Sequence, residues 1–254
     1  MNGRLEGKTA VIFGGAGRIG SSVARAYAGE GARVVLVDRN RDRLLGVKES
    51  LLKSIEQDLV ILEATIDTMD DAKVMTETLR REIDSVDILV NCPAYISRAS
   101  FLEHSLEEFD RQWHVNVRIV FMVSQAIARW MAEGAGGKII NLASVGGLYP
   151  EKGHSGHCTA KAAIIALSRV MALELASHSI QVNVVAPGPT ETVPFSSPFY
   201  TQHPEILQRI EEKTPAGRIG HPEDHTGLMV FLASDESNWI TGQVILSDGG
   251  LGLV

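Results

Sequence analysis

The sequence has little cysteine and no long apolar run, and both shortages narrow the class of protein. Two cysteines are present among 254 residues, Cys92 and Cys158, and they show no paired spacing. This usage fits reduced thiols in a reducing compartment and argues against a disulfide framework. No apolar run approaches the roughly eighteen residues that a membrane span needs, so we expect a soluble protein.

An excess of positive charge is also missing. The net charge is -7, and the only basic run is the short one at Arg39, Arg41 and Arg43, which is typical of a solvated helix start. Nucleic acid is therefore not an expected partner.

The N-terminal stretch MNGRLEGKTA lacks the apolar segment of a secretory signal peptide, which favours a cytoplasmic location. His154, His157 and Cys158 are close in sequence but have no evident fourth ligand, so no metal site is predicted.

Short apolar runs alternate with longer segments of helical period, which predicts βαβ units and a parallel sheet buried on both faces. The expected strands are 9–13, 33–38, 59–64, 87–91, 138–143, 181–186 and 243–248. The expected helices are 18–30, 41–56, 69–84, 105–133, 155–177 and 222–234. The prediction is a Rossmann-type, doubly wound α/β sheet of about seven strands with helices on both faces. Residues 1–254 are expected to form one dinucleotide-binding and catalytic domain.

The segment 187–220 is rich in proline, which favours a long surface excursion over continued sheet. Within it, residues 190–213 are expected to form a lid over a substrate. Aromatic and apolar side chains in this lid would suit a partly apolar ligand. They are Phe195, Phe199, Tyr200 and Leu207.

A glycine-rich turn, GGAGRIG (14–20), joins the first strand to the first helix. Glycines there let the backbone approach a pyrophosphate, and the helix start offers free N–H groups to it. Asp38 ends the second strand, where an acidic side chain accepts hydrogen bonds from ribose hydroxyls and repels a 2′-phosphate. NAD is therefore preferred over NADP, although Arg39 is a residue type that pairs with a 2′-phosphate.

The segment NLASVGGLYPEKGHSGHCTAK (141–161) places His157 thirteen residues after Ser144 and four before Lys161. Here the chain resembles the short-chain dehydrogenase/reductase family, and in particular its 3-oxoacyl-acyl-carrier-protein-reductase-like members. The family has a serine and, thirteen residues on, the tyrosine of Tyr-x-x-x-Lys. His157 takes the place of that tyrosine. The resemblance covers residues 5–250, including the C-terminal stretch 217–250.

The resemblance implies a set of cofactor contacts. Gly14 and Gly20 match the family's glycine pattern, while Phe13 and Arg18 depart from it. At 91–94, NCPA stands where the family has Asn-Asn-Ala-Gly, and Pro93 stiffens this segment. Asp67 is expected at adenine, and PGPTET (187–192) at the nicotinamide carboxamide. The predicted cofactor-binding residues are Gly14, Arg18, Ile19, Gly20, Asp38, Arg39, Asp67, Thr68, Asn91, Pro93, Lys161, Pro187, Gly188, Thr190 and Thr192.

The resemblance also implies catalytic roles. Ser144 would orient the substrate, Lys161 would hold the ribose, and Asn116 would support a proton relay. Each also has a purely structural interpretation: Ser144 would cap a strand end, Lys161 would be a solvated helix residue, and Asn116 would bend its helix through a backbone contact. The implied activity is NAD(H)-dependent hydride exchange with a secondary alcohol or ketone, and the implied assembly is a homotetramer.

His157 leaves three interpretations open. In the first, imidazole transfers the proton in place of phenol. A nearby Lys161 cation would lower the pKa of His157 below about 6.5 and leave the ring mostly neutral at pH 7. A neutral ring can accept a proton from an alcohol, which makes oxidation the easier direction. Imidazole is also about 2 Å shorter than phenol. In the second, Tyr149, His154 or Tyr95 supplies the proton. In the third, the protein is a catalytically impaired NAD-binding partner or regulatory subunit.

Overall fold

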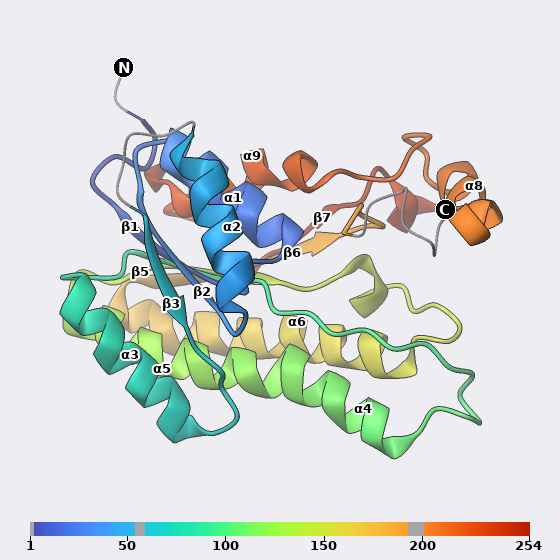
Figure 1. The fold of residues 1–254 in the computed structure, drawn as a ribbon, viewed down its shortest axis with the longest axis horizontal. Coiled ribbons are helices and arrows are strands. Elements are labelled where there is room, and N and C mark those ends of the chain that lie inside the picture. Colours follow the sequence, from blue (N-terminus) through green and yellow to red (C-terminus); the bar gives the residue numbers. More distant parts are fainter. Residues whose placement is uncertain (1–2, 54–58, 193–200) are drawn as a thin grey trace.

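The computed structural model describes residues 3–53, 59–192 and 201–254, and these form one seven-stranded parallel sheet (Figure 1). The strand order is β3-β2-β1-β4-β5-β6-β7. The strands are β1 (Thr9–Phe13), β2 (Arg33–Asp38), β3 (Val60–Glu63), β4 (Ile88–Asn91), β5 (Gly137–Leu142), β6 (Ile180–Pro187) and β7 (Val244–Ser247). The predicted doubly wound, Rossmann-type sheet is confirmed.

Helices cover both faces of the sheet. The described α-helices are α1 (Arg18–Gly29), α2 (Arg41–Leu52), α3 (Met69–Glu82), α4 (Leu106–Trp113), α5 (Ile119–Glu133), α6 (Ser155–Leu175), α8 (Pro204–Lys213) and α9 (Thr226–Ala233). Figure 1 shows α1, α2 and α9 on one face and α3, α4, α5 and α6 on the other. Within the described residues, no helix is long and apolar enough to cross a membrane.

The strand sequences explain this arrangement. Successive side chains of a strand point to opposite faces, and in β1 Ile12 packs into the core under α1 and α9, whereas Val11 packs into the core under α3 and α5. All five residues of β1 are buried. A strand with apolar side chains on both faces must be covered on both, which requires the crossover helices of parallel βαβ units.

The proline-rich excursion is where the prediction was incomplete. The structure places helix α8 at 204–213, where an irregular surface loop was expected. Pro204 stands in the first turn of this helix, where the missing N–H costs nothing because first-turn N–H groups have no intrahelical partner. Three of the predicted lid residues, Phe195, Phe199 and Tyr200, lie outside the described residues.

The strand order fixes where a site can form. The chain moves from β1 to β2 and β3 on one side, then returns to β4 on the other side of β1. Open parallel sheets bind ligands outside the carboxyl ends of their strands at such a reversal. The glycine turn after β1 and the NCPA segment after β4 meet there, because these two strands pair directly.

Candidate active site

A cavity of about 1340 Å³ lies over the carboxyl ends of the strands. It is larger than the roughly 300–1,000 Å³ of a typical small-molecule site, so it has room for a dinucleotide and a substrate together. Its lining includes Gly14, Arg18, Ile19, Gly20, Asp38, Arg39, Asp67, Pro93, Ser144, His157, Lys161, Pro187, Gly188, Thr190 and Thr192. Three other predicted site residues, Thr68, Asn91 and Asn116, do not line it.

The glycine turn leaves no space for side chains. Gly14 has φ of +78°, and a Cβ there would lie 2.8 Å from the carbonyl carbon of Cys92. A Cβ on Gly20 would lie 2.5 Å from the carbonyl oxygen of Gly14. Helix α1 begins after Gly17 with no side-chain cap and no acidic residue in its first turn. Its free N–H groups and positive dipole end are therefore available to an anion.

Asp38 is tied to this turn. Its Oδ2 accepts a hydrogen bond from the backbone N–H of Ala16 at 3.2 Å, and its Oδ1 accepts one from the N–H of Asn40 at 3.1 Å. The carboxylate thus stands between the end of β2 and the glycine turn. Arg39 and Arg43 also line this end of the cavity and are exposed. The Arg18 guanidinium, expected near a phosphate, lies 3.6 Å from the carboxylate of Glu191.

Asp67 and Thr68 both follow β3, but Asp67 lines the cavity and Thr68 caps a helix. Asp67 lines the cavity, and its Oδ1 lies 3.1 Å from Nε2 of His114. Thr68 caps helix α3: its Oγ1 accepts from the N–H of Asp71 and donates to the Asp71 carboxylate. The Asp71 pKa is lowered, first by the hydrogen bond from the Thr68 side chain.

Asn91 points from the sheet toward the face that α5 and α6 cover. Its Nδ2 donates to Asn141 Oδ1 at 2.8 Å and to Ser124 Oγ at 3.0 Å, and the Asn141 amide donates onward to Ser168. Asn91 Oδ1 is buried without a hydrogen-bond partner among the described residues. The structure therefore places Asn91 beneath the cavity, and Pro93 two residues later at its wall.

Asn116 lies in a π-helical turn, His114–Arg118, between α4 and α5. Its side chain is fully buried and spans the Tyr95 backbone: Oδ1 accepts from the Tyr95 N–H at 3.1 Å, and Nδ2 donates to the Tyr95 carbonyl at 2.8 Å. These contacts fix the segment after β4. The relay role of Asn116 stays a prediction.

Ser144 and His157 come together although a loop separates them in sequence. Ser144 follows β5, and its Oγ accepts from the N–H of Gly146 at 3.1 Å. A Cβ added to Gly146 would lie 3.6 Å from Ser144 Oγ and 3.8 Å from His157 Cδ2. Both side chains therefore border the space beside Gly146, and both line the cavity.

The His157 imidazole is neutral over the whole physiological range. Its pKa falls to about 3, chiefly through burial and then through Lys161, His154 and Arg98. The predicted direction is confirmed, but burial is a larger cause than the Lys161 cation. The ring is 8% exposed, and its Nδ1 has no hydrogen-bond partner among the described residues.

Lys161 lies one helical turn beyond His157. Its Nζ donates to the carbonyl of Leu142 at 2.9 Å, and burial lowers its pKa to about 8. The Cys92 thiol is close enough to interact with this ammonium; burial raises the pKa of Cys92 to about 12. Sequence reasoning had treated Cys92 only as an unpaired thiol.

The other candidate proton donors differ in availability. The Tyr95 hydroxyl donates to Glu108 at 2.7 Å, and this bond is the main cause of its raised pKa, so its proton is already committed. Tyr149 is 49% exposed and lines the cavity. His154 also lines it, and burial lowers the pKa of this residue.

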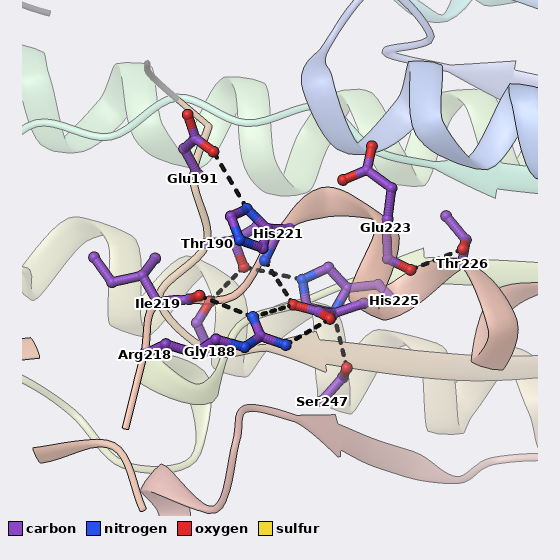
Figure 2. A network of polar contacts seen from close by, with 11 residues as sticks. Gly188, Thr190, Glu191, Arg218, Ile219, His221, Glu223, His225, Thr226 and Ser247 are labelled. Carbon is purple, nitrogen blue, oxygen red and sulfur yellow. Dashed lines mark hydrogen bonds and ion pairs between the residues drawn. The ribbon is translucent and has the colours of Figure 1, made fainter. Parts of the chain in front are cut away.

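Sequence reasoning missed His225, which fixes the threonine segment (Figure 2). Thr190 Oγ1 donates to the Gly188 carbonyl at 2.9 Å and lies 2.9 Å from Nε2 of His225. The other nitrogen, Nδ1, lies 2.8 Å from Ser247 Oγ. A neutral ring with Nε2–H donating to Thr190 and Nδ1 accepting from Ser247 satisfies all three groups. Burial lowers the His225 pKa, which favours this neutral form.

A second set of charges holds the same segment from outside. Glu191 lies 3.3 Å from His221 Nδ1 as well as near Arg18. Arg218 makes two hydrogen bonds to Asp224, at 2.6 Å and 2.8 Å, and they hold the pKa of Asp224 well below its usual range. Figure 2 shows the Glu191 carboxylate directed toward His221, close to Thr190. Arg218, His221 and Asp224 lie in the stretch 217–250 that resembles the family, but the sequence assigned them no role.

The buried imidazole predicts acid sensitivity. The folded His157 pKa of about 3 lies below the unfolded value, so the unfolded chain binds a proton first as the pH falls. The stabilisation is complete above about pH 6.5 and is lost toward pH 3, which removes about 2 kcal/mol between pH 7 and pH 5. Urea unfolding of His157→Gln should show a shallower loss over this range than wild type. Equal losses would contradict the burial of a neutral ring.

The residues present fit a bound dinucleotide. A Rossmann-type fold binds a dinucleotide with three parts that are present here. They are a glycine turn without room for a Cβ at Gly14 or Gly20, an uncapped helix start, and an acidic side chain at the end of β2. The serine, imidazole and ammonium at the opposite wall add groups that polarise an alcohol or carbonyl. Together they define a nicotinamide-dependent oxidoreductase.

Comparison with known proteins identifies the family. The family model described as enoyl-(acyl carrier protein) reductase matches residues 14–252, and the chain belongs to the short-chain dehydrogenase/reductase family. It is 35% identical to 3-oxoacyl-[acyl-carrier-protein] reductase FabG of Thermotoga maritima, over 98% of this chain and 99% of the relative. It is 36% identical to sorbitol dehydrogenase of Cereibacter sphaeroides, over 97% of this chain and 98% of the relative.

A solved structure agrees with this assignment. The crystal structure of a putative NAD(P)-dependent gluconate 5-dehydrogenase from Beutenbergia cavernae, with bound NADP at low occupancy, has a TM-score of 0.91. It is 30% identical to this protein, and the match covers 98% of each chain. The protein is accordingly an enzyme of a family that uses nicotinamide cofactors.

Proposed function

We propose that the protein exchanges hydride between NAD(H) and a secondary alcohol or ketone. The observation that carries this proposal is the convergence of Ser144, His157 and Lys161 on the cavity that the glycine turn also lines. These side chains come from three places in the chain: the end of β5 and two successive turns of α6. Their meeting beside a dinucleotide cradle gives the chemistry a site.

The residues divide the work as follows. The bound nicotinamide accepts or supplies the hydride. Ser144 Oγ orients the substrate oxygen, and the neutral His157 ring accepts the alcohol proton. Lys161 holds the ribose, and Asn116 fixes the Tyr95 backbone at the cavity wall. Thr190, held by His225, positions the carboxamide.

Oxidation is the direction that this site favours. A ring with a pKa of about 3 is in its neutral form at pH 7, so no imidazolium is present to donate a proton to a carbonyl. Reduction needs a protonated donor in reach, and Tyr149 is the cavity-lining phenol whose hydroxyl is not bonded to Glu108. We expect the ratio of oxidation to reduction at neutral pH to be high.

NAD is the proposed cofactor. The Asp38 carboxylate, anchored by the Ala16 and Asn40 N–H groups, would repel a 2′-phosphate. Replacing Asp38 with alanine would leave Arg39 and Arg43 to bind that phosphate. We expect at least a tenfold shift toward NADPH in the ratio of dissociation constants, since hydrogen bonds to charged groups are worth about 1.5–3 kcal/mol. Fluorescence titration with NADH and NADPH measures it, and an unchanged ratio would refute the assignment.

We further propose a cytoplasmic homotetramer and a substrate lid at 190–213. Helices α4, α5 and α6 expose apolar side chains that a second copy would cover: Leu106, Phe121, Val170 and Leu173 are exposed by 72%, 44%, 49% and 81%. Ile210 and Lys213 of α8 line the cavity, which is where a lid residue must lie.

The decisive experiment is an assay of the purified protein. NADH binding should saturate, and NAD⁺ should be reduced with at least one member of a panel of secondary alcohols, polyols and sugar acids; relatives of this chain include a sorbitol dehydrogenase and a putative gluconate 5-dehydrogenase. Saturable NADH binding without turnover across the panel, and no gain on His157→Tyr, would instead indicate an NAD-binding subunit without catalysis.

A further inference from the structure

We propose that the substrate end of the cavity takes a hydroxy acid or keto acid, whose carboxylate pairs with Arg98 and is also bound by His154. This inference rests on the proposed function and names its substrate class.

The backbone around Arg98 is held in place from two sides. At one end, the Asn116 side chain bonds both the N–H and the carbonyl of Tyr95. At the other, the N–H of Ala99 donates to the carbonyl of Gly153 at 3.2 Å. Gly153 lies in the loop that leads into α6, immediately before His154. The segment 95–99 is therefore fixed against the wall that carries His154 and His157.

Arg98 brings an uncompensated charge to this wall. Its side chain lines the cavity and is exposed. No carboxylate forms an ion pair with it within the described part of the chain. Its charge contributes to the lowered pKa of both His154 and His157, so the guanidinium lies within electrostatic range of both rings. A fork of five N–H donors without a partner matches a carboxylate.

The two rings supply a second, independent indication. The Nδ1 atoms of His154 and His157 are both buried without a hydrogen-bond partner among the described residues, and the ring centres are 6.2 Å apart. Buried polar atoms are normally satisfied, and both residues line the cavity, so a ligand that draws these rings toward the cavity would complete them. An uncharged alcohol would satisfy a ring but would leave Arg98 unpaired.

One acidic side chain competes for this position. Glu151 lines the cavity, and its carboxylate lies 3.7 Å from His154 Nδ1, beyond hydrogen-bond distance. This carboxylate is 67% exposed and can turn into solvent when a ligand arrives. Removing its charge should therefore strengthen the binding of an acid, the opposite of the effect expected at Arg98.

The test uses two matched pairs of probes. Gluconate and sorbitol differ at C1, as carboxylate and hydroxymethyl; 3-hydroxybutyrate and 1,3-butanediol differ in the same way. Binding to the NADH-loaded protein is measured by calorimetry, which does not require turnover. We expect at least one acid to bind about tenfold or more tightly than its alcohol, as for hydrogen bonds to a charged group. Arg98→Gln should abolish the difference, and Glu151→Gln should increase it.

Lys152→Gln is the matched control, since it removes a neighbouring positive charge that does not line the cavity. It should keep the preference for the acid. Equal affinities within both pairs, no saturable binding of either acid, or a preference that survives Arg98→Gln would overturn the inference. If the wild-type protein did not bind NADH, this result would instead refute the proposed function.

Discussion

Replacing His157 with glutamine is expected to lower the rate constant of alcohol oxidation by about a hundredfold, the lower end of the usual contribution of a positioned proton acceptor, because a ring with a pKa of about 3 is a weak base. Glutamine keeps a polar group of similar size beside Ser144 and Lys161 but cannot accept a proton at neutral pH. The dissociation constant of NADH should change little, because the proposed cofactor contacts are the glycine turn, Asp38 and Lys161 rather than the His157 ring. Single-turnover oxidation and fluorescence titration measure the two quantities. Oxidation at the wild-type rate would assign the proton to another residue.

The pH profile of the same reaction adds a sharper criterion. The sequence predicts a His157 pKa below about 6.5, and the buried ring has a pKa of about 3. Oxidation should therefore show no step from His157 between pH 5 and 8. Lys161, with a pKa of about 8, is the group of this site that titrates near that range. His157→Tyr supplies a donor with longer reach, so it should raise carbonyl reduction at pH 7, and an unchanged reduction rate would contradict this role.

Replacing Gly14 with alanine should weaken NADH binding by at least about tenfold and lower the free energy of unfolding by about 2–5 kcal/mol. Part of this cost is the positive φ of +78°, which costs an L-residue about 1–2 kcal/mol. The rest comes from the new Cβ, 2.8 Å from the Cys92 carbonyl carbon, because overpacking typically costs about 1–3 kcal/mol. The atoms nearest to the new Cβ are backbone atoms of Cys92 and Pro93. The glycine turn and the segment after β4 must therefore move apart. NADH titration and urea unfolding measure the effects.

Gly46→Ala is the matched control for this substitution. Gly46 lies in the exposed middle of α2, its φ is not positive, and a Cβ there would meet nothing within 4 Å. Alanine in a helix interior is favoured over glycine by about 0.5–1 kcal/mol, so this variant should be slightly more stable and bind NADH normally. If Gly14→Ala behaved like Gly46→Ala, the glycine turn would not be the cofactor cradle.

The sheet was predictable from the sequence because its signal is local and strong. The runs TAVIF and RVVLVD become β1 and β2 with the bounds that the sequence indicated. Helix α8 was not predictable in the same way. Its apolar positions are few and none of its residues is buried, so proline content dominated the pattern, although Pro204 at the first turn is compatible with a helix.

The sequence by itself determined the strands along the chain, the glycine turn, and the presence of Ser144, His157 and Lys161 at family spacing, because each depends on residue type and short-range periodicity. The order of the strands within the sheet is a property of the tertiary structure. Tertiary structure also decided what surrounds the site residues. Burial, more than the nearby Lys161, takes the His157 pKa to about 3, and His225 reaches Thr190 from 35 positions away. Asn116 and Gly153 hold the segment that brings the Arg98 charge near His154. Desolvation and long-range contacts depend on the packed environment, and no local pattern encodes them.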